Sequence, residues 1–377
     1  MEPARRNDQS PSARSVRALP IVVQHSAGTP GANGPLTAVR RVLDSALSEQ
    51  YEFVRMHQVG GNGGLNVPLL RQWTRLLRRV RPDLVHVRGL QNEGFHGVLA
   101  ARMAGCPRIL VTVHGTVRDL KHGGRTWRRA MLAHGAEPST LRMASHFATV
   151  CEYAAGRSFL RAYEDKFVGV IPNGVPLPAE VDADARNSRR ADLGLAHDDL
   201  VMIAVARLNW DKGFGVLADA LRRLPPQAGR RVLLVAGDGP DRVGITQALA
   251  GVPGTEVRLL GNRLDVPDLL SAADVFVFPT LHENLSNALL EAMAHALPVV
   301  ASAVGGNVEV LRQGGGHLVR AGDPEAFAGA LGPLLSNAAE RRHVGETGRK
   351  VVQDAYSLPV MLRSLDGVYR RILEGAV

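Results

Sequence analysis

The stretch VMIAVARLNWDKG, residues 201–213, decides the fold of this 377-residue chain. It opens with an uninterrupted apolar run that has the length of a buried strand in a parallel sheet. Two cations, Arg207 and Lys212, follow in a loop that ends at Gly213. In open α/β sheets ligands bind at the carboxyl ends of the strands, where this loop lies. Arg207 can form paired hydrogen bonds with phosphate oxygens and Lys212 adds a second charge, so the stretch predicts an anion site.

A second stretch, HENLSNALLEAMA at residues 282–294, places two carboxylates, Glu283 and Glu291, eight positions apart around an expected helix start. The first-turn N–H groups of a helix are free to bind an anion. Here those groups belong to Leu285, Ser286 and Asn287. A phosphate site between two hydroxyl-binding carboxylates is typical of a nucleotide-sugar site. The alternative is that both glutamates are solvated charges on a surface helix, as most glutamates are.

The rest of the chain alternates apolar runs of strand length with helical or glycine-rich segments. The expected strands of the first half are 21–24, 51–56, 84–87, 109–113, 146–150 and 167–171. Those of the second half are 201–206, 232–236, 256–260, 275–278, 299–301 and 317–319. This alternation predicts the α/β class, with two Rossmann-like, doubly wound parallel sheets that face each other across a cleft.

In their order, these motifs resemble the donor domain of retaining glycosyltransferases with the GT-B fold, specifically family GT4. The resemblance covers residues 201–310, about a hundred positions, and no single motif would carry it. The matching segments are Ala206-Arg207-Leu208 with Lys212-Gly213, Ala236-Gly237-Asp238-Gly239-Pro240, Leu260-Gly261, Ala273 to Pro279, the Glu283 and Glu291 pair, and Pro298-Val299-Val300 with Gly305-Gly306.

The resemblance implies a reaction in which a sugar leaves a nucleoside diphosphate and keeps its anomeric configuration on the acceptor. Glu283 would then hold hydroxyls of the donor sugar, and Glu291 those of the ribose. Arg207, Lys212 and the helix start would stabilise the charge of the leaving diphosphate. The leaving phosphate would accept the proton of the acceptor, so no metal or other cofactor is expected. Uridine or guanosine donors are expected by analogy with the family, with Gly261 near the base.

The first half is expected to supply the opposite side of the cleft. A glycine-rich loop after the first strand includes Gly31 and Gly34, where the backbone can approach a ligand closely, although such turns are also common without a ligand. His114 ends an apolar strand and resembles the family position that contacts the donor sugar. His86 is a weaker candidate, because histidines at strand ends are more often structural. The family often has glycine where Asn284 stands, and asparagine also tolerates left-handed backbone angles.

Proline and glycine mark the domain boundary at IPNGVPLP, residues 171–178. We therefore expect a polar N-terminal tail at 1–16, an acceptor domain at 17–172 and a donor domain at 173–354. An amphipathic helix within 355–377 would cross back to the first domain, as such tails do in the family.

The chain carries a formal net charge of +9, which favours a polyanionic partner or surface. Residues 68–81 form an amphipathic pattern in which arginines oppose Leu70, Trp73 and Leu77. Either this apolar side is core and the arginines are solvated, or the helix lies on an anionic membrane surface. Two cysteines, no apolar run of spanning length and no secretory signal favour the cytoplasm, peripherally on the inner membrane face if the second reading holds.

These features favour a hexose-type glycosyltransferase of cell-surface polysaccharide synthesis, with a glycan or lipid-linked acceptor. Nucleic-acid binding would explain the charge, but aromatic residues make up only 5% of the chain and no known binding motif is recognised. A sugar-nucleotide epimerase shares the two-domain architecture, and a non-catalytic sugar-nucleotide binder would share the whole pattern.

Overall fold

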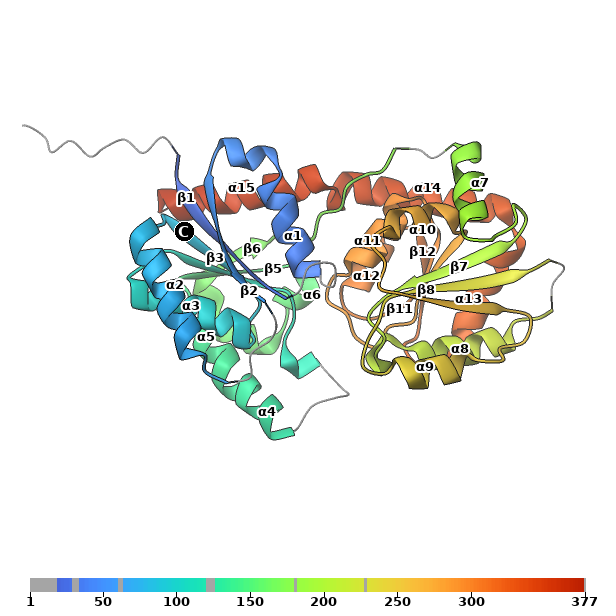
Figure 1. The fold of residues 1–377 in the computed structure, drawn as a ribbon, viewed down its shortest axis with the longest axis horizontal. Helices are drawn as coiled ribbons and strands as arrows, with labels where there is room; N and C mark the ends of the chain where they lie inside the picture. Colours follow the sequence, from blue (N-terminus) through green and yellow to red (C-terminus); the bar gives the residue numbers. More distant parts are fainter. Residues whose placement is uncertain are drawn as a thin grey trace, which may run out of the picture.

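The computed structural model describes residues 19–28, 34–59, 64–119, 126–179, 182–226 and 229–375, which form two α/β domains side by side (Figure 1). The first contains a six-stranded parallel sheet in the order β2-β1-β3-β4-β5-β6. Its strands are β1 Ile21–Ala27, β2 Glu52–Gln58, β3 Leu84–Arg88, β4 Ile109–Val113, β5 His146–Thr149 and β6 Phe167–Val170. Its helices are α1 Gly34–Leu43, α2 Val67–Val80, α3 Asn92–Ala104, α4 Thr126–Met131, α5 Glu137–Met143 and α6 Glu152–Ala155.

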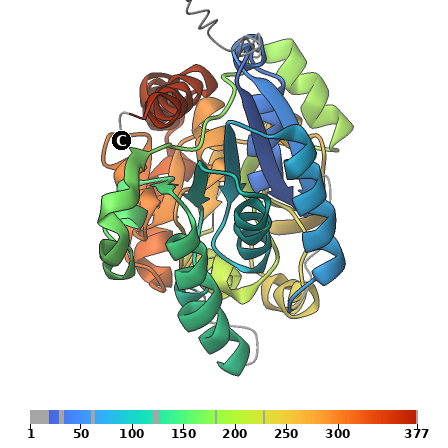
Figure 2. The ribbon, with the colours of Figure 1, turned by 90° about the vertical axis from the view of Figure 1, so that its left-hand side faces the viewer.

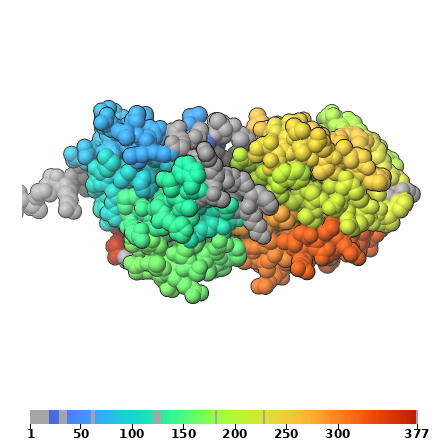
Figure 3. All heavy atoms as spheres, turned by 90° about the horizontal axis from the view of Figure 1, so that it is seen from below, coloured from blue at the N-terminus to red at the C-terminus, as the bar shows by residue number. Residues whose placement is uncertain are grey.

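The second domain repeats this plan with the parallel order β12-β11-β10-β7-β8-β9. Its strands are β7 Leu200–Val205, β8 Arg231–Ala236, β9 Glu256–Gly261, β10 Val275–Phe278, β11 Val299–Ser302 and β12 Gly316–Val319. Its helices are α7 Ala183–Asp192, α8 Phe214–Arg223, α9 Arg242–Leu249, α10 Val266–Ala272, α11 Asn287–Ala294, α12 Gly306–Leu311, α13 Pro324–Ser336 and α14 Ala338–Val351. Figure 3 shows the two domains from below, the first in blue to green and the second in yellow to red.

The predicted fold class is confirmed, and the apolar runs explain why. Each of the twelve expected strands begins within one residue of the observed strand. Residues of the central strands of both sheets are buried on both faces, as in β4, where Ile109, Leu110 and Val111 have no exposed surface, whereas the edge strands β2 and β9 are partly exposed. Helices cover both faces of each sheet, which is the arrangement that continuous apolar strands require.

The amphipathic helix α2 settles one of the two readings of its apolar side. Leu70, Trp73 and Leu77 are buried in a core cluster with residues of β3 and α3. Arg71, Arg75, Arg78 and Arg79 are exposed. The apolar side of α2 is therefore core, as the first of the two readings has it, and contact of its basic side with a membrane stays a prediction. Within the described ranges, no helix has the length and apolar character for a membrane crossing.

The chain passes between the domains twice. The linker after β6 pairs with the segment before α15, through Val175 N–H to Tyr356 O at 3.0 Å and Leu358 N–H to Val175 O at 2.8 Å. Helix α15, Leu358–Glu374, then runs over the first domain, whereas α14 lies on the second (Figure 1). Arg371 of α15 donates to the carbonyl of Val168 in β6 at 2.9 Å.

A buried hydrogen-bond network joins α15 to the first sheet. The Tyr369 hydroxyl, which has no exposed surface, accepts from Gln24 Nε2 at 2.7 Å and lies 2.6 Å from His86 Nδ1. His86 Nε2 lies 2.6 Å from the Thr112 hydroxyl. His86, the weaker catalytic candidate, therefore has both ring nitrogens engaged in structure.

We expect Tyr369→Phe to lower the free energy of unfolding by about 1–3 kcal/mol, because it leaves two buried polar groups without their partner. Chemical denaturation measures the change. Tyr153→Phe, at a residue 38% exposed, is the control and should change stability by less than about 0.5 kcal/mol. Equal effects of the two variants would show that the network does not hold α15 in place.

Candidate active site

The carboxyl ends of strands from both sheets meet between the domains. His114 follows β4 of the first domain, and Asn284 lies in the loop between β10 and α11 of the second. Asn284 Nδ2 donates to the His114 carbonyl at 3.0 Å. Beside it, Asn173 of the linker donates to the Leu285 carbonyl at 2.8 Å. The loop at residues 284–285 is therefore held by the first domain and by the linker.

Lys212 and Glu283 form an ion pair at the centre of this region. Lys212 ends a short 3-10 helix, Trp210–Lys212, after β7, and its Nζ lies 2.6 Å from Glu283 Oε2. Glycine is required next: Gly213 has φ +72°, and a Cβ there would lie 2.0 Å from the Pro279 carbonyl. The loops after β7 and β10 therefore pack backbone against backbone, which brings the two predicted residues together.

A second backbone contact, from the segment before α12, supports the loop that carries Glu283. Gly305, before α12, has φ +49°, and a Cβ there would lie 1.7 Å from the Glu283 carbonyl. Gly306 N–H donates to the Asn284 carbonyl at 2.7 Å. This explains why a glycine pair follows β11: any side chain at Gly305 would displace the Glu283 backbone.

Helix α11 begins in this loop. Ser286 is its N-cap, and the serine hydroxyl accepts from Leu289 N–H at 3.3 Å. Asn284, Leu285 and Ser286 are buried, and Asn287 is the first helical residue. The predicted helix start thus lies between the two carboxylates, with its positive dipole end directed into the loop.

Glu291 lies one turn into α11 and is paired with a residue that the sequence did not indicate. Arg41 of α1 places Nη2 2.7 Å from Glu291 Oε1 and donates through Nη1 to the Gly174 carbonyl at 2.8 Å. The guanidinium therefore joins the first domain, the linker and the second domain. It fixes one oxygen of Glu291, while no described residue bonds the other oxygen.

His114 is a neutral imidazole. Burial, with a smaller contribution from the positive charge of Arg88, lowers the pKa of His114 to about 3. Its Nε2 is buried and has no hydrogen-bond partner among the described residues. His114 can therefore offer a hydrogen bond to a ligand between the domains, but it does not carry a positive charge at neutral pH.

The remaining predicted residues are placed as follows. Arg207 is exposed just after β7, and its side chain makes no ion pair with the described residues. Gly261 ends β9 with φ +67°, and its carbonyl accepts from Gly237 N–H at 2.8 Å. Gly34 is the first residue of α1. Gly31 lies outside the described residues.

Arg41 and Asn173 are the functional candidates that sequence reasoning missed. Arg41 is one of two adjacent arginines on an amphipathic helix, and nothing in the local pattern distinguishes it from Arg40. Asn173 stands in the Pro-Asn-Gly segment of the domain boundary, where the sequence predicts a turn but not a contact with Leu285. The described residues also hold no group of three His, Cys, Asp or Glu side chains that could bind a metal ion.

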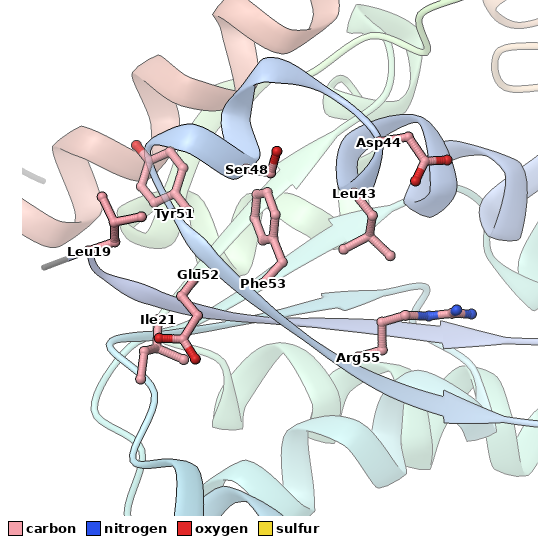
Figure 4. Close-up of a pocket in the computed structure, with 9 residues that line it drawn as sticks. All are labelled: Leu19, Ile21, Leu43, Asp44, Ser48, Tyr51, Glu52, Phe53 and Arg55. Atoms are coloured by element: carbon pink, nitrogen blue, oxygen red, sulfur yellow. The ribbon is translucent and has the colours of Figure 1, made fainter.

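A surface pocket of about 710 Å³ lies on the first domain, away from the residues described above (Figure 4). Leu19, Ile21, Tyr51 and Glu52 line it, and they stand at or before the amino ends of β1 and β2. His114 and Glu283 follow the carboxyl ends of their strands, so the hollow lies at the opposite edge of the sheet. It is not part of the candidate site.

Comparisons with known proteins place both halves in one family. A model described as Glycosyltransferase Family 4 matches residues 25–178, and one described as Glycosyl transferases group 1 matches residues 199–337. The chain is 36% identical over 192 residues to a D-inositol 3-phosphate glycosyltransferase of Xylanimonas cellulosilytica, covering 48% of this chain and 46% of that protein. It thus spans about half the length of that relative.

Two further likenesses cover more of the chain. It is 30% identical over 270 residues to the Escherichia coli UDP-Gal:alpha-D-GlcNAc-diphosphoundecaprenol alpha-1,3-galactosyltransferase, covering 68% of this chain and 67% of that protein. The crystal structure of Anabaena HepE in complex with UDP-glucose matches with a TM-score of 0.75 and 17% identity, over 93% of this chain and 99% of that chain. The order of the sheets, the loops that meet between them and these matches agree: the chain belongs to the group 1, family 4 glycosyltransferases and has the GT-B fold.

Proposed function

We propose that this glycosyltransferase moves a hexose from a UDP- or GDP-sugar to a glycan or lipid-linked acceptor with retention of anomeric configuration and without a metal ion. The observation that carries the proposal is the Lys212–Glu283 pair beside the capped start of α11, with Glu291 one turn further on. The cation and the helix start suit the diphosphate of a nucleotide-sugar. Glu283 suits the hydroxyls of its sugar, and Glu291 those of its ribose.

Each residue has a chemical task in this proposal. Glu283 accepts hydrogen bonds from hydroxyls of the donor sugar while Lys212 holds its carboxylate in place. Arg207, Lys212 and the α11 start at Leu285, Ser286 and Asn287 stabilise the negative charge that develops on the leaving diphosphate. The free oxygen of Glu291 binds the ribose. Neutral His114 bonds the sugar from the first domain, and Gly34 and Gly261 allow the backbone to approach the ligand; Gly31 is assigned to the donor site on its sequence position alone.

The activities for which relatives are named support the acceptor class. The Escherichia coli relative is named for a UDP-sugar donor and an acceptor on diphosphoundecaprenol, which is a lipid-linked glycan. We therefore place this chain in cell-surface polysaccharide synthesis, working in the cytoplasm. Membership in a transferase family also favours transfer over epimerisation.

Thermal stabilisation by UDP, GDP, ADP and dTDP tests the donor site, for the wild type and for Glu291→Ala. A ligand at about a hundred times its dissociation constant stabilises a protein by about 2.7 kcal/mol, which raises the melting temperature. We expect one nucleotide to be preferred and the variant to respond less. Sugar release from the matching nucleotide-sugar then separates an enzyme from a silent binder. No response to any nucleotide would contradict the proposal.

Arg41→Met tests the ribose contact. Arg41 fixes one oxygen of Glu291 by a charge-assisted hydrogen bond, and such bonds contribute about 1.5–3 kcal/mol. We expect the donor KM to rise about tenfold with kcat within about threefold, because ribose binding is the same in the ground state and the transition state. Arg40→Met, on the exposed side of α1, is the matched control. A lower KM in Arg41→Met would show instead that Arg41 competes with the ribose for Glu291.

For contact with a lipid-linked acceptor, we propose that the first domain associates with anionic membranes through surface charge. The exposed arginines of α2 supply the charge, and α4, which protrudes from the domain (Figure 2), carries Trp127 and Met131, 54% and 63% exposed. Tryptophan and basic residues favour the headgroup region. Co-sedimentation with vesicles containing phosphatidylglycerol at physiological salt checks this. A variant in which Arg71, Arg75, Arg78 and Arg79 are all replaced by glutamine should lose binding to the vesicles.

A further inference from the structure

Arg88, the last residue of β3, is a buried cation without a counter-charge. The residue is 8% exposed. Its Nη1 donates to Gln24 Oε1 at 2.8 Å and to the His25 carbonyl at 3.4 Å, both of which are neutral groups. No aspartate or glutamate of the described chain lies within ion-pair distance of this guanidinium, whereas the site arginine Arg41 has its carboxylate.

The surroundings of Arg88 cannot supply the missing negative charge. Burial raises the pKa of Tyr369 to about 12, so its hydroxyl stays protonated. Burial, with the charge of Arg88 as a second cause, lowers the pKa of His25 to about 3 and that of His86 well below its usual value. An uncompensated buried charge costs several kcal/mol in general, so a ligand that brings the opposite charge would recover part of that cost.

The position of Arg88 identifies which part of a substrate could reach it. Arg88, His114 and Thr112 line a cavity of about 30 Å³ together with the linker segment Pro172 to Gly174 and with apolar side chains of α1 and α15. This volume holds one or two water-sized groups, so it fits one or two oxygens of an oxyanion but not a sugar ring. His114, whose Nε2 is buried and has no hydrogen-bond partner among the described residues, lines the same cavity.

We propose that Arg88 binds an oxyanion, a phosphate or a carboxylate, carried by the acceptor substrate. The inference rests on the proposed function, because that function assigns the donor diphosphate to Arg207 and Lys212 of the other domain. Arg88 belongs to the first domain and lines one cavity with His114, whose carbonyl accepts a hydrogen bond from Asn284 of the other domain. The anion of the acceptor completes the charge balance that the free protein lacks.

Thermal melting with two small anions tests the site directly. The probes are inorganic phosphate and glucose 1-phosphate, each compared with sodium chloride at equal ionic strength. We expect the wild type and Lys212→Met to gain about 2–4 °C at a phosphate concentration well above the dissociation constant, and Arg88→Met to gain less than half of that, because only the donor-diphosphate site then remains for phosphate. Arg75→Met, which removes an exposed arginine of α2, is the matched control and should respond like the wild type.

A nucleotide arm in the same experiment separates this inference from the proposed function. Arg88→Met should keep the melting shift given by the preferred nucleoside diphosphate, which also shows that the variant is folded; Arg88→Gln serves if the methionine variant does not fold. An unchanged phosphate response in Arg88→Met, or no response in the wild type while the nucleotide still binds, overturns the anion site. Loss of every nucleotide response with a retained Arg88-dependent phosphate response overturns the donor assignment alone.

A final arm asks which substrate carries the anion. UDP-glucuronate is compared with UDP-glucose, or the GDP pair if guanosine is preferred, in the wild type and in Arg88→Met. Equal binding of the two donors in both proteins supports an acceptor-borne anion. A tenfold preference for the uronate that disappears in Arg88→Met would assign the oxyanion to the donor sugar and overturn the acceptor assignment.

Discussion

Replacing Glu283 by glutamine is expected to lower kcat by about 100- to 1,000-fold, with a small effect on stability. The carboxylate is 18% exposed and pairs with Lys212 at 2.6 Å, so it is held rigidly where a sugar hydroxyl would bind. Glutamine keeps the shape but accepts weaker hydrogen bonds and releases Lys212. Loss of one preorganised charged group that contacts the reacting sugar is expected to cost about this much in kcat. Initial rates of nucleotide release at saturating donor and acceptor measure the change.

The form of the loss distinguishes the role of Glu283. A fall in kcat and kcat/KM together means that the contact strengthens in the transition state, whereas a rise in KM alone means uniform binding. Glu325→Gln on the exposed side of α13 is the control and should leave both constants unchanged. Unchanged kcat in Glu283→Gln would remove this carboxylate from the reaction and leave it as a tether for Lys212.

The fold could be predicted because its strands are local signals. A run such as residues 275–278 is apolar throughout, and only a strand covered on both faces buries all of its side chains. Helix α2 was ambiguous for a different reason. Its sequence has one apolar and one basic side, and the same pattern suits packing against α3 or against a membrane. Burial of Trp73 decides between them, and it depends on tertiary contacts.

In the candidate site, too, some residues could be predicted from a local motif and others depend on contacts between distant parts of the chain. Glu283, Ser286 and Glu291 lie within one motif, so their arrangement follows from the helix that they begin. The contacts made by Arg41 and Arg88 join residues from distant parts of the chain, the first spanning 250 positions. No periodicity carries that information. Buried charge without a partner can be recognised only when the packing around it is known.

Acidification from pH 7.5 to pH 5 is expected to destabilise the fold by about 4 kcal/mol through His25 and His114 alone. Burial lowers the pKa of each to about 3, against a usual value of 6.5 in the unfolded chain. Below pH 6.5 these two histidines are therefore protonated in the unfolded chain but stay neutral in the folded protein. The stability that these residues confer is complete above pH 6.5 and declines until about pH 3. Each contributes about 1.4 kcal/mol per pH unit, or about 2 kcal/mol at pH 5.

Chemical denaturation of the wild type and His114→Gln at pH 7.5 and pH 5 isolates one of these contributions. Glutamine does not titrate, so the variant should lose about 2 kcal/mol less than the wild type over this interval, whatever its stability at pH 7.5. The difference between the two proteins removes the contribution of carboxylates, which they share. His197→Gln, at a side chain 83% exposed, should show the full wild-type loss. If His114→Gln loses as much as the wild type, the imidazole is not held neutral between the domains, and its proposed role as an uncharged contact to the donor sugar fails with it.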